Sequence, residues 1–350
     1  MSDTSFCVLE AHELLRLDAR GFDAIEDARH RRYVRDVIER GYLSDALKLI
    51  DAHVLADGSP VATYVPSLRR DHVDGFAERL ERELDQFGLR CPPELMRQMM
   101  AMRALMVPLD DDELAFALSR TWLIGPWLDD VCESSSEFSL MSLRTGAGRG
   151  DNTALLKYSD FMFAELERLS SPRFMPVFRM MFYKSFVGTL FESHLANAAM
   201  PFSEQAYEYI RGYNGFSEYW FLSAQFLGGS LDFPSNVTFW ADIMPSCVAF
   251  LNDFNDLLSF YKEAIDGESF ATNRLFLKSL ASSAASYPDI YLHTLRSGMA
   301  AYHAIARSAA GQDGDALRHV VHYMRGFVYW SFHCPRYRWR ELFPDLDYLV

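Results

Sequence analysis

Apolar residues recur every three or four positions through most of this 350-residue chain, and this spacing constrains the fold more than any other feature. Such spacing places apolar side chains along one face of an α-helix. Alternating polar and β-branched residues, which are typical of strands, are scarce. The sequence therefore predicts an all-α protein. Its clearest helical segments are residues 34–50, 76–87, 94–106, 113–128, 155–169 and 173–198.

Clusters of Gly, Pro, Asp and Ser interrupt the helical pattern and predict loops rather than linkers between domains. A chain of 350 residues is close to the most that one hydrophobic core organises. We therefore expect one domain over residues 1–350, with N-terminal helices in about residues 1–100 and a motif-bearing core in about residues 101–350. The predicted loops are residues 57–60, 91–93, 145–150, 232–236 and 311–315.

Charge and cysteine content narrow the class of protein. Lys and Arg total 34 against 48 Asp and Glu, a formal net charge of −14, which argues against a nucleic-acid partner. The five cysteines are scattered singly, which argues against a disulfide framework and favours a reducing compartment. We find no signal-peptide pattern at the N-terminus, and charges interrupt apolar runs such as residues 174–190. We therefore expect a cytoplasmic protein without membrane insertion.

Two acidic clusters stand at opposite ends of the helix predicted at residues 113–128. Residues 110–113 precede it, where carboxylates cap free N–H groups and favour the positive end of the helix dipole. We interpret that cluster as a cap. Asp129, Asp130 and Glu133 lie at the other end, where the dipole disfavours carboxylates unless a cation offsets them. Their spacing directs the three carboxylates to one side of the helix. They are interpreted either as a magnesium site or as an acidic helix end exposed to solvent.

A polar stripe interrupts an apolar helical segment nearer the C-terminus. Asn255, Ser259 and Glu263 stand at positions i, i+4 and i+8, within about 80° of one helix face. An amide oxygen, a hydroxyl and a carboxylate can approach one hard cation. Lys262 projects from nearly the same face and suits a diphosphate oxygen. A solvated helix edge is the alternative, and it explains each residue singly better than all four together.

Together the two motifs resemble those of the class I terpene cyclases, specifically the fungal trichodiene synthase family of sesquiterpene cyclases. The resemblance matches the aspartate-rich motif of the family to Asp129, Asp130 and Glu133, with Glu in place of the final Asp. The second metal motif of the family, NDxxSxxKE, is matched in full by Asn255, Asp256, Ser259, Lys262 and Glu263. The resemblance implies that the two motifs hold three Mg²⁺ ions against a diphosphate, with Mn²⁺ as a substitute.

Further matches extend the resemblance over residues 122–350. Arg211 corresponds to the diphosphate-sensing arginine of the family, Asn214 to its linker, and Gly215 to the helix break whose carbonyl faces the forming cation. Arg336 and Tyr337 correspond to the closing pair that hydrogen-bonds diphosphate. A guanidinium can grip phosphate oxygens with two N–H groups, and a phenol adds a donor without charge. Arg338 and Arg340 are expected at the surface.

The resemblance implies a class I terpene synthase helical bundle around a central active-site cavity. It implies a lyase that ionises farnesyl diphosphate with Mg²⁺, cyclises the carbocation to a sesquiterpene hydrocarbon or alcohol, and releases pyrophosphate. Cyclases for geranyl or geranylgeranyl diphosphate are alternatives. So is a non-catalytic helical protein that binds an isoprenoid diphosphate. A chain-elongating prenyltransferase would normally carry a second aspartate-rich motif. A homodimer is compatible with these expectations.

Aromatic residues are expected to line the remaining wall, because their faces stabilise a cation without trapping it covalently. Helical register relative to the motifs selects Trp122, Phe327 and Trp330. The competing interpretation is that each is a core residue, since aromatic side chains at helical spacing usually are. The histidines at 194, 322 and 333 are interpreted as structural, and no protein base is assigned because departing diphosphate can take the final proton.

Overall fold

A computed structural model describes residues 16–51, 68–133, 153–196, 204–214, 217–267, 273–276 and 287–349. Within these ranges every regular element is an α-helix or a short 3-10 helix, so the all-α prediction is confirmed. No helix in them is both long and apolar enough to cross a membrane. The α-helices are α2 (Ala28–Glu39), α3 (Tyr42–Asp51), α4 (Arg70–Gln86), α5 (Pro93–Met106), α6 (Asp112–Glu133), α8 (Thr153–Arg168), α9 (Met175–Ala196), α10 (Glu204–Asn214), α11 (Ser217–Leu222), α12 (Val237–Asp266), α14 (Tyr287–Gln312) and α15 (Gly314–His333).

Within the same described ranges, six short 3-10 helices connect or extend these elements: η1 (Ala19–Ala24), η2 (Ser223–Leu227), η3 (Gly229–Leu231), η4 (Phe233–Ser235), η5 (Pro335–Tyr337) and η6 (Trp339–Glu341). One of them occupies a predicted loop. The Asp232 side chain accepts a hydrogen bond from the Ser235 N–H at 3.2 Å and so closes the turn of η4. The predicted break at residues 311–315 shrinks to Asp313, whose side chain caps α15 by accepting from the Ala316 N–H at 2.7 Å. The predicted loops at residues 57–60 and 145–150 lie outside the described residues.

The chain divides into two compact units. Unit 1 comprises residues 1–67, 202–207 and 241–349, and unit 2 comprises residues 68–201, 208–240 and 350. Each unit has its own internal packing. The expectation of a single domain over the whole chain stays a prediction.

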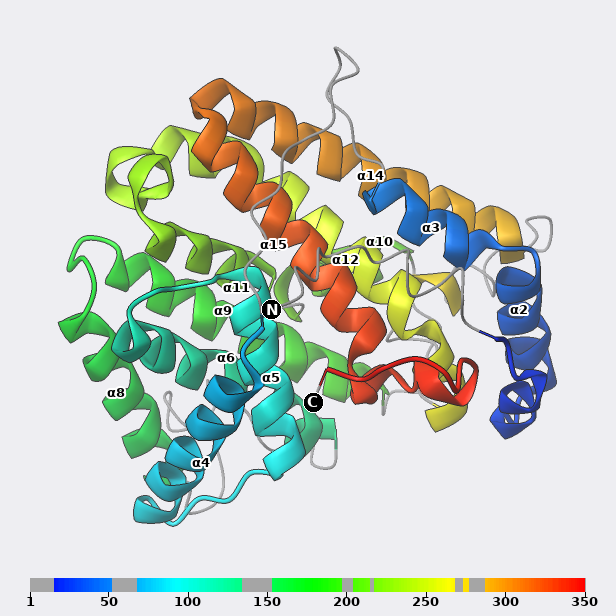
Figure 1. The fold of residues 1–350 in the computed structure, drawn as a ribbon, viewed down its shortest axis with the longest axis horizontal. Helices are drawn as coiled ribbons and strands as arrows, with labels where there is room; N and C mark the ends of the chain where they lie inside the picture. The colour runs from blue at the N-terminus through cyan, green and yellow to red at the C-terminus, as the bar shows by residue number, and fades with distance from the viewer. Residues whose placement is uncertain are drawn as a thin grey trace. The chain divides into compact units, whose positions relative to one another are not determined.

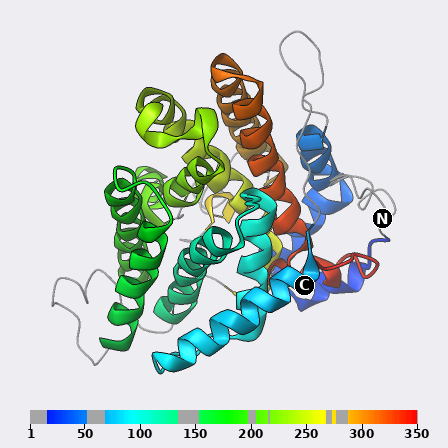
Figure 2. The same ribbon diagram turned by 60° about the vertical axis from the view of Figure 1, so that its left-hand side comes forward.

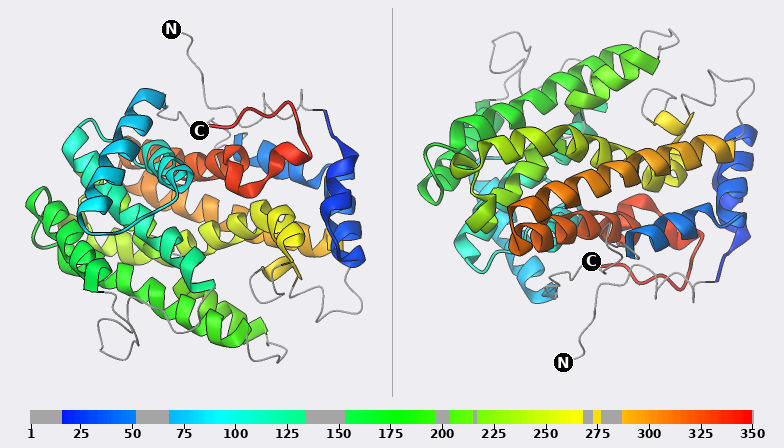
Figure 3. Two further views of the ribbon diagram at one scale, coloured as in Figure 1. Left: turned by 90° about the horizontal axis from the view of Figure 1, so that it is seen from below. Right: turned by 90° about the horizontal axis from the view of Figure 1, so that it is seen from above.

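In unit 1, α14 and α15 lie side by side, and α2 and α3 pack against α14 (Figure 1). Trp339 joins the C-terminal segment to this core, because its ring stacks on Tyr261 of α12 with centroids 5.6 Å apart. The same ring lies 5.7 Å from Phe332 of α15. Figure 3 shows the C-terminal segment, in red, running beside the blue N-terminal helices, where the Asp18 N–H donates to the Leu342 carbonyl at 2.7 Å. Within unit 1, the segment around Asp18 is thus fixed to the C-terminal segment around Leu342.

In unit 2, α4 packs on α5 and α5 on α6, while α8 and α9 both pack on α6 (Figure 2). α11 packs on α9. Aromatic rings fill the contact between those two helices, since Phe178 lies 4.7 Å and Phe182 lies 5.1 Å from the ring of Tyr219. α6, against which α5, α8 and α9 pack, ends in the second acidic cluster.

Candidate functional site

The polar stripe lies on α12, which is continuous across it. Asn255, Ser259 and Glu263 follow one another at successive turns and therefore share one helix face. Ser259 and Glu263 are only 3% and 7% exposed. Burial of a carboxylate is costly without donors or cations around it. The stripe is thus a set of oxygen atoms held largely away from bulk water.

Tyr337 fixes the orientation of the first residue of the stripe. The Asn255 amide nitrogen donates to the Tyr337 hydroxyl at 3.2 Å, so the amide oxygen is the atom that points away from the phenol. Burial raises the pKa of Tyr337 to about 12, which keeps the hydroxyl protonated near neutral pH. The ring of Trp330 meets that of Tyr337 edge-on at 5.5 Å. The structure therefore brings together Asn255, Tyr337 and Trp330 within unit 1.

Another part of α12 is held by a segment that the sequence motifs do not single out. The Asn273 amide donates to the Asp256 carbonyl at 3.0 Å and to the Ser259 hydroxyl at 3.4 Å. The Arg274 N–H donates to the Asp256 carboxylate at 3.2 Å, and its guanidinium pairs with Asp253. Asp253 and Asp256 therefore take part in structural contacts with the 273–276 segment. Asn273 was missed because only the fold brings it back to α12.

Lys262 stands one turn from a shared carboxylate at the end of α12. Its amine lies 3.7 Å from Asp266, whose other oxygen accepts from Arg338 at 2.8 Å. Arg338 also donates to Glu341 at 2.7 Å. Arg340 is exposed as predicted, whereas Arg338 is half-buried and holds two carboxylates. Arg338 is thus a surface residue, as expected, but the turn after η5 directs its guanidinium toward Asp266 of α12.

The other predicted residues of unit 1 lie on α15 and η5. Phe327 and Trp330 are buried on α15, and Phe327 lies 6.4 Å from Phe250 of α12. Arg336 is half-buried in η5, beside Tyr337. His333 is buried, with its Nδ1 atom 2.9 Å from the Asp347 carbonyl, which fits the structural role expected for it. His322 is buried as well.

Two further predicted residues have described side chains in unit 2. Arg211 is half-buried in the last turn of α10. That turn is positioned by Lys184 of α9, whose amine lies 4.7 Å from the Tyr213 ring and pairs with Glu218 of α11 at 2.6 Å. Trp122 is fully buried in α6, and its indole donates to the Ser223 hydroxyl at 3.0 Å.

The aspartate-rich motif occupies the C-terminal end of α6. The structure describes the helix through Glu133, but the side chains of Asp129, Asp130 and Glu133 lie outside the described residues. The same holds for the side chain of Asn214, the last residue of α10, for His194, and for Gly215. The roles of these residues stay predictions.

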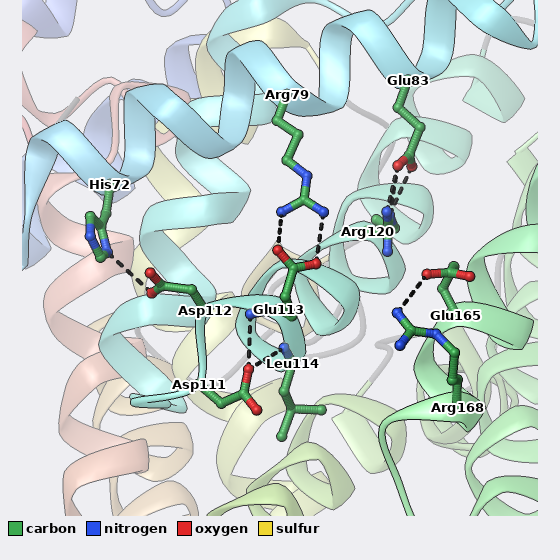
Figure 4. A network of polar contacts seen from close by, with 10 residues as sticks. All are labelled: His72, Arg79, Glu83, Asp111, Asp112, Glu113, Leu114, Arg120, Glu165 and Arg168. Carbon is green, nitrogen blue, oxygen red and sulfur yellow. Dashed lines mark hydrogen bonds and ion pairs between the residues drawn. The ribbon is translucent and has the colours of Figure 1, made fainter.

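The first acidic cluster is a helix cap, as predicted. One Asp111 oxygen accepts hydrogen bonds from the N–H groups of Glu113 and Leu114 at 2.9 and 3.1 Å (Figure 4). Glu113 itself receives two hydrogen bonds from Arg79 of α4, at 2.7 and 2.8 Å. Capping and ion pairing therefore account for this cluster without a metal ion.

The chemistry of the α12 stripe fits a magnesium ion. Amide, hydroxyl and carboxylate oxygens are hard ligands, and the orientation of Asn255 presents its amide oxygen rather than its nitrogen away from Tyr337. One carboxylate alone does not neutralise a divalent ion, so phosphate oxygens would have to complete the site. Within the described residues no three His, Cys, Asp or Glu side chains gather so that they could hold a metal. The stripe would instead bind a metal ion largely through neutral oxygen ligands, namely the Asn255 amide and the Ser259 hydroxyl.

Two fungal proteins are similar to part of the chain. Alpha-cuprenene synthase COP6 of Coprinopsis cinerea is 31% identical over 143 residues, which are 40% of this chain and 40% of that protein. Terpene synthase 29 of Postia placenta is 32% identical over 150 residues, which are 42% of this chain and 40% of that protein. The matched segments span about two-fifths of these relatives' length. No protein-family model matches the chain.

Solved structures of a bacterial enzyme share the fold. The 2-methylisoborneol synthase of Streptomyces coelicolor A3(2), in complex with Mg²⁺ and 2-fluoroneryl diphosphate, has a TM-score of 0.58, covering 77% of this chain and 94% of that one at 15% identity. A complex with Mg²⁺ and geranyl-S-thiolodiphosphate has a TM-score of 0.57, covering 80% of this chain and 96% of that one at 15% identity. The predicted class I terpene synthase fold is thereby confirmed. Membership of the trichodiene synthase family stays a prediction.

Proposed function

We propose that this chain is a magnesium-dependent class I terpene cyclase that ionises a prenyl diphosphate. The observation that carries the proposal is the stripe of Asn255, Ser259 and Glu263, with Tyr337 hydrogen-bonded to its first residue at 3.2 Å. The fungal relatives are terpene synthases, which supports the same reaction class. The fold is compatible with it, although a fold by itself does not define an activity.

Ionisation of an allylic diphosphate separates a carbocation from a leaving group of high negative charge. Bound Mg²⁺ would neutralise that charge and so favour cleavage of the carbon–oxygen bond. Asn255, Ser259 and Glu263 would be ligands of the metal, and the resemblance adds Asp129, Asp130 and Glu133 as a second set of ligands. The resemblance to the trichodiene synthase family supports three Mg²⁺ ions held by these residues.

Four cationic or phenolic groups would bind the diphosphate directly: Lys262, Arg211, Arg336 and Tyr337. Preorganised donors of this kind usually make the largest electrostatic contribution to catalysis. Tyr337 is suited to the task because burial raises the pKa of its hydroxyl to about 12, so it stays a donor at physiological pH. Asn214 would link Arg211 to Gly215, and the Gly215 carbonyl would face the forming cation.

Aromatic rings would supply the wall for the carbocation. Trp330 and Phe327 are buried on α15, and Trp330 touches Tyr337 edge-on, which puts an aromatic ring next to a proposed diphosphate donor. Trp122 would contribute from α6. A cation over an aromatic face gains about 0.5–2 kcal/mol without forming a bond. No protein base is required if pyrophosphate takes the final proton.

For the substrate we propose farnesyl diphosphate, which would make the product a sesquiterpene hydrocarbon or alcohol. The proposal of a prenyl diphosphate is supported by the diphosphate analogues bound in the structures of 2-methylisoborneol synthase. The farnesyl chain length comes from the resemblance of the motifs to the trichodiene synthase family. Geranyl and geranylgeranyl diphosphates are the alternatives that the experiment must include.

The test is turnover by the purified chain with Mg²⁺ and farnesyl, geranyl or geranylgeranyl diphosphate in turn. We expect pyrophosphate release with a volatile cyclic product from farnesyl diphosphate, identified by gas chromatography. A parallel reaction with isopentenyl diphosphate added detects chain elongation, which would yield a longer prenyl diphosphate instead. Failure to release pyrophosphate from all three substrates would overturn the proposal.

A further inference from the structure

The side chain of Asn273 joins the segment of residues 273–276 to α12 within unit 1. It is fully buried. Its amide oxygen accepts a hydrogen bond from the Leu275 N–H at 2.8 Å, and its nitrogen donates to the Asp256 main-chain carbonyl at 3.0 Å and the Ser259 hydroxyl at 3.4 Å. An amide nitrogen carries two hydrogen atoms, so each of these two acceptors can receive one.

Two backbone groups fix which way this amide faces. The oxygen and nitrogen of an amide can exchange places by rotation, so their order follows from the groups around them. The Leu275 N–H can only donate, and the Asp256 carbonyl can only accept. The oxygen of Asn273 must therefore face its own segment, and the nitrogen must face α12. Ser259 consequently meets a donor, and its hydroxyl oxygen accepts.

Ser259 differs in this respect from two other buried serines within long helices. The Ser119 and Ser331 hydroxyls each donate to the carbonyl four residues earlier, at 2.8 and 2.9 Å. Such a bond turns a hydroxyl toward the backbone of its own helix. Ser259 instead accepts from Asn273. Because a hydroxyl oxygen has two lone pairs, this contact uses one and leaves the other for a hard cation.

We infer that Asn273 is a positioning residue for Ser259, which keeps the Ser259 hydroxyl available as a ligand of the metal ion. This inference rests on the proposed function, because it takes Ser259 to be a ligand of Mg²⁺. Without Asn273, the Ser259 hydroxyl can donate to the Asn255 carbonyl four residues earlier. The hydroxyl would then be divided between the helix backbone and the metal ion, so more Mg²⁺ would be needed to fill the site.

The test is the Mg²⁺ concentration that gives half-maximal binding of inorganic pyrophosphate, measured by calorimetric titration. Asn273→Ser shortens the side chain so that it no longer reaches Ser259, while the new hydroxyl can still accept from the Leu275 N–H. We expect this variant to need about threefold more Mg²⁺, a modest change because the lost contact spans 3.4 Å. Saturating Mg²⁺ should restore binding. An unchanged Mg²⁺ requirement in the folded variant overturns the inference.

A double-mutant cycle shows whether Asn273 acts through Ser259. In the Ser259→Ala background, where Asn255 and Glu263 are still in place, Asn273→Ser should change the Mg²⁺ requirement less than about 1.5-fold. An equal effect in both backgrounds would mean that Asn273 acts through Asp256 or through packing alone, and it would overturn the inference. If Ser259→Ala binds pyrophosphate too weakly to measure, Asn273→Ser and the controls below decide.

Two controls separate positioning from local folding. Asn273→Ala also removes the acceptor for Leu275 and should raise the Mg²⁺ requirement as much as Asn273→Ser does. An effect of the alanine variant alone would assign it to the local turn and overturn the inference. Thr294→Val removes a buried hydroxyl of α14, which donates to the Ile290 carbonyl at 3.1 Å, and should lower the melting temperature without changing the Mg²⁺ requirement. An equal rise in Thr294→Val would likewise contradict a specific role of Asn273.

The wild-type chain separates failure of the inference from failure of the proposed function. Mg²⁺-dependent binding of pyrophosphate, with the same Mg²⁺ requirement in the wild type and Asn273→Ser, overturns the inference alone. Equal binding of pyrophosphate with and without Mg²⁺ overturns the proposed function and the inference with it.

Discussion

Each unit contains a group of buried polar side chains, and the two groups differ in whether the side chains that contact them are charged or neutral. In unit 2, Glu83 receives hydrogen bonds from both the Nε and the terminal nitrogen of Arg120, at 2.5 to 3.1 Å (Figure 4). It receives one more from the Tyr158 hydroxyl at 3.0 Å. In unit 1, two neutral groups contact the stripe: the Tyr337 hydroxyl accepts from Asn255, and the Asn273 amide donates to the Ser259 hydroxyl.

The difference distinguishes a structural polar group from one suited to a ligand. A carboxylate that already has a bidentate guanidinium and a phenol has little capacity left for another cation. A hydroxyl that accepts one hydrogen bond from a neutral amide, as Ser259 does, has a second lone pair that suits a metal ion. The comparison predicts that Glu83 matters for stability and that the α12 stripe matters for turnover.

The largest effect is expected from Glu83→Gln. Arg120 is only 5% exposed and would be left without its counter-charge, so the free energy of unfolding should fall by about 3 kcal/mol. Urea denaturation followed by circular dichroism measures the change. Glu113→Gln is the matched control, because its pair with Arg79 is exposed and should be worth about 1 kcal/mol or less. Equal losses in the two variants would show that the buried Glu83 pair contributes no more to stability than the exposed Glu113 pair.

Next in size is the combined change Asn255→Ala and Ser259→Ala. Removal of two proposed metal ligands should lower the rate of pyrophosphate release by at least about a hundredfold. Helical content should stay unchanged, since both residues lie within a long helix and alanine favours helix. Retained turnover in a folded variant would remove the stripe from the mechanism.

A smaller loss, in stability, is expected from Gly21→Ala. The added Cβ would lie 2.7 Å from the Glu341 carbonyl oxygen and 2.8 Å from a Leu342 methyl group, which forces the C-terminal segment outward. Such overpacking should cost about 1–3 kcal/mol in the free energy of unfolding. Gly75→Ala on α4, where the new Cβ meets nothing within 4 Å, should stabilise instead. Similar thermal melting shifts in both variants would contradict the tight contact.

The smallest effect concerns the cap of α6. Asp111→Ala removes the acceptor for two N–H groups and should cost about 1 kcal/mol in unfolding free energy. Asp110→Ala, at an exposed neighbouring position, should change stability by less than about 0.5 kcal/mol. A larger loss from Asp110→Ala than from Asp111→Ala would show that the cluster does not act as a cap.

Helix positions could be predicted because apolar periodicity is a local signal. The segments expected at residues 94–106 and 155–169 coincide closely with α5 and α8. The placement of the capping cluster before α6 was equally accessible, because acceptors and N–H groups there are neighbours in sequence. The helical repeat alone was enough to predict the stripe of Asn255, Ser259 and Glu263.

Contacts between distant segments were not accessible from the sequence. Asn273 reaches Ser259 only because the chain turns back on α12, and Arg338 reaches Asp266 across 72 positions. The contact of Gly21 with the C-terminal segment is likewise a product of packing, with no motif to signal it. Motifs identify the groups that would touch a ligand, whereas these contacts arise only from the fold.

The central claim is that the α12 stripe binds diphosphate through magnesium, and calorimetric titration of inorganic pyrophosphate with and without Mg²⁺ tests it most directly. The wild-type chain should bind pyrophosphate only when Mg²⁺ is present. The variant with Asn255→Ala and Ser259→Ala should lose the Mg²⁺-dependent part of that binding while remaining folded. Equal Mg²⁺-dependent affinity in the wild type and the variant would contradict the claim.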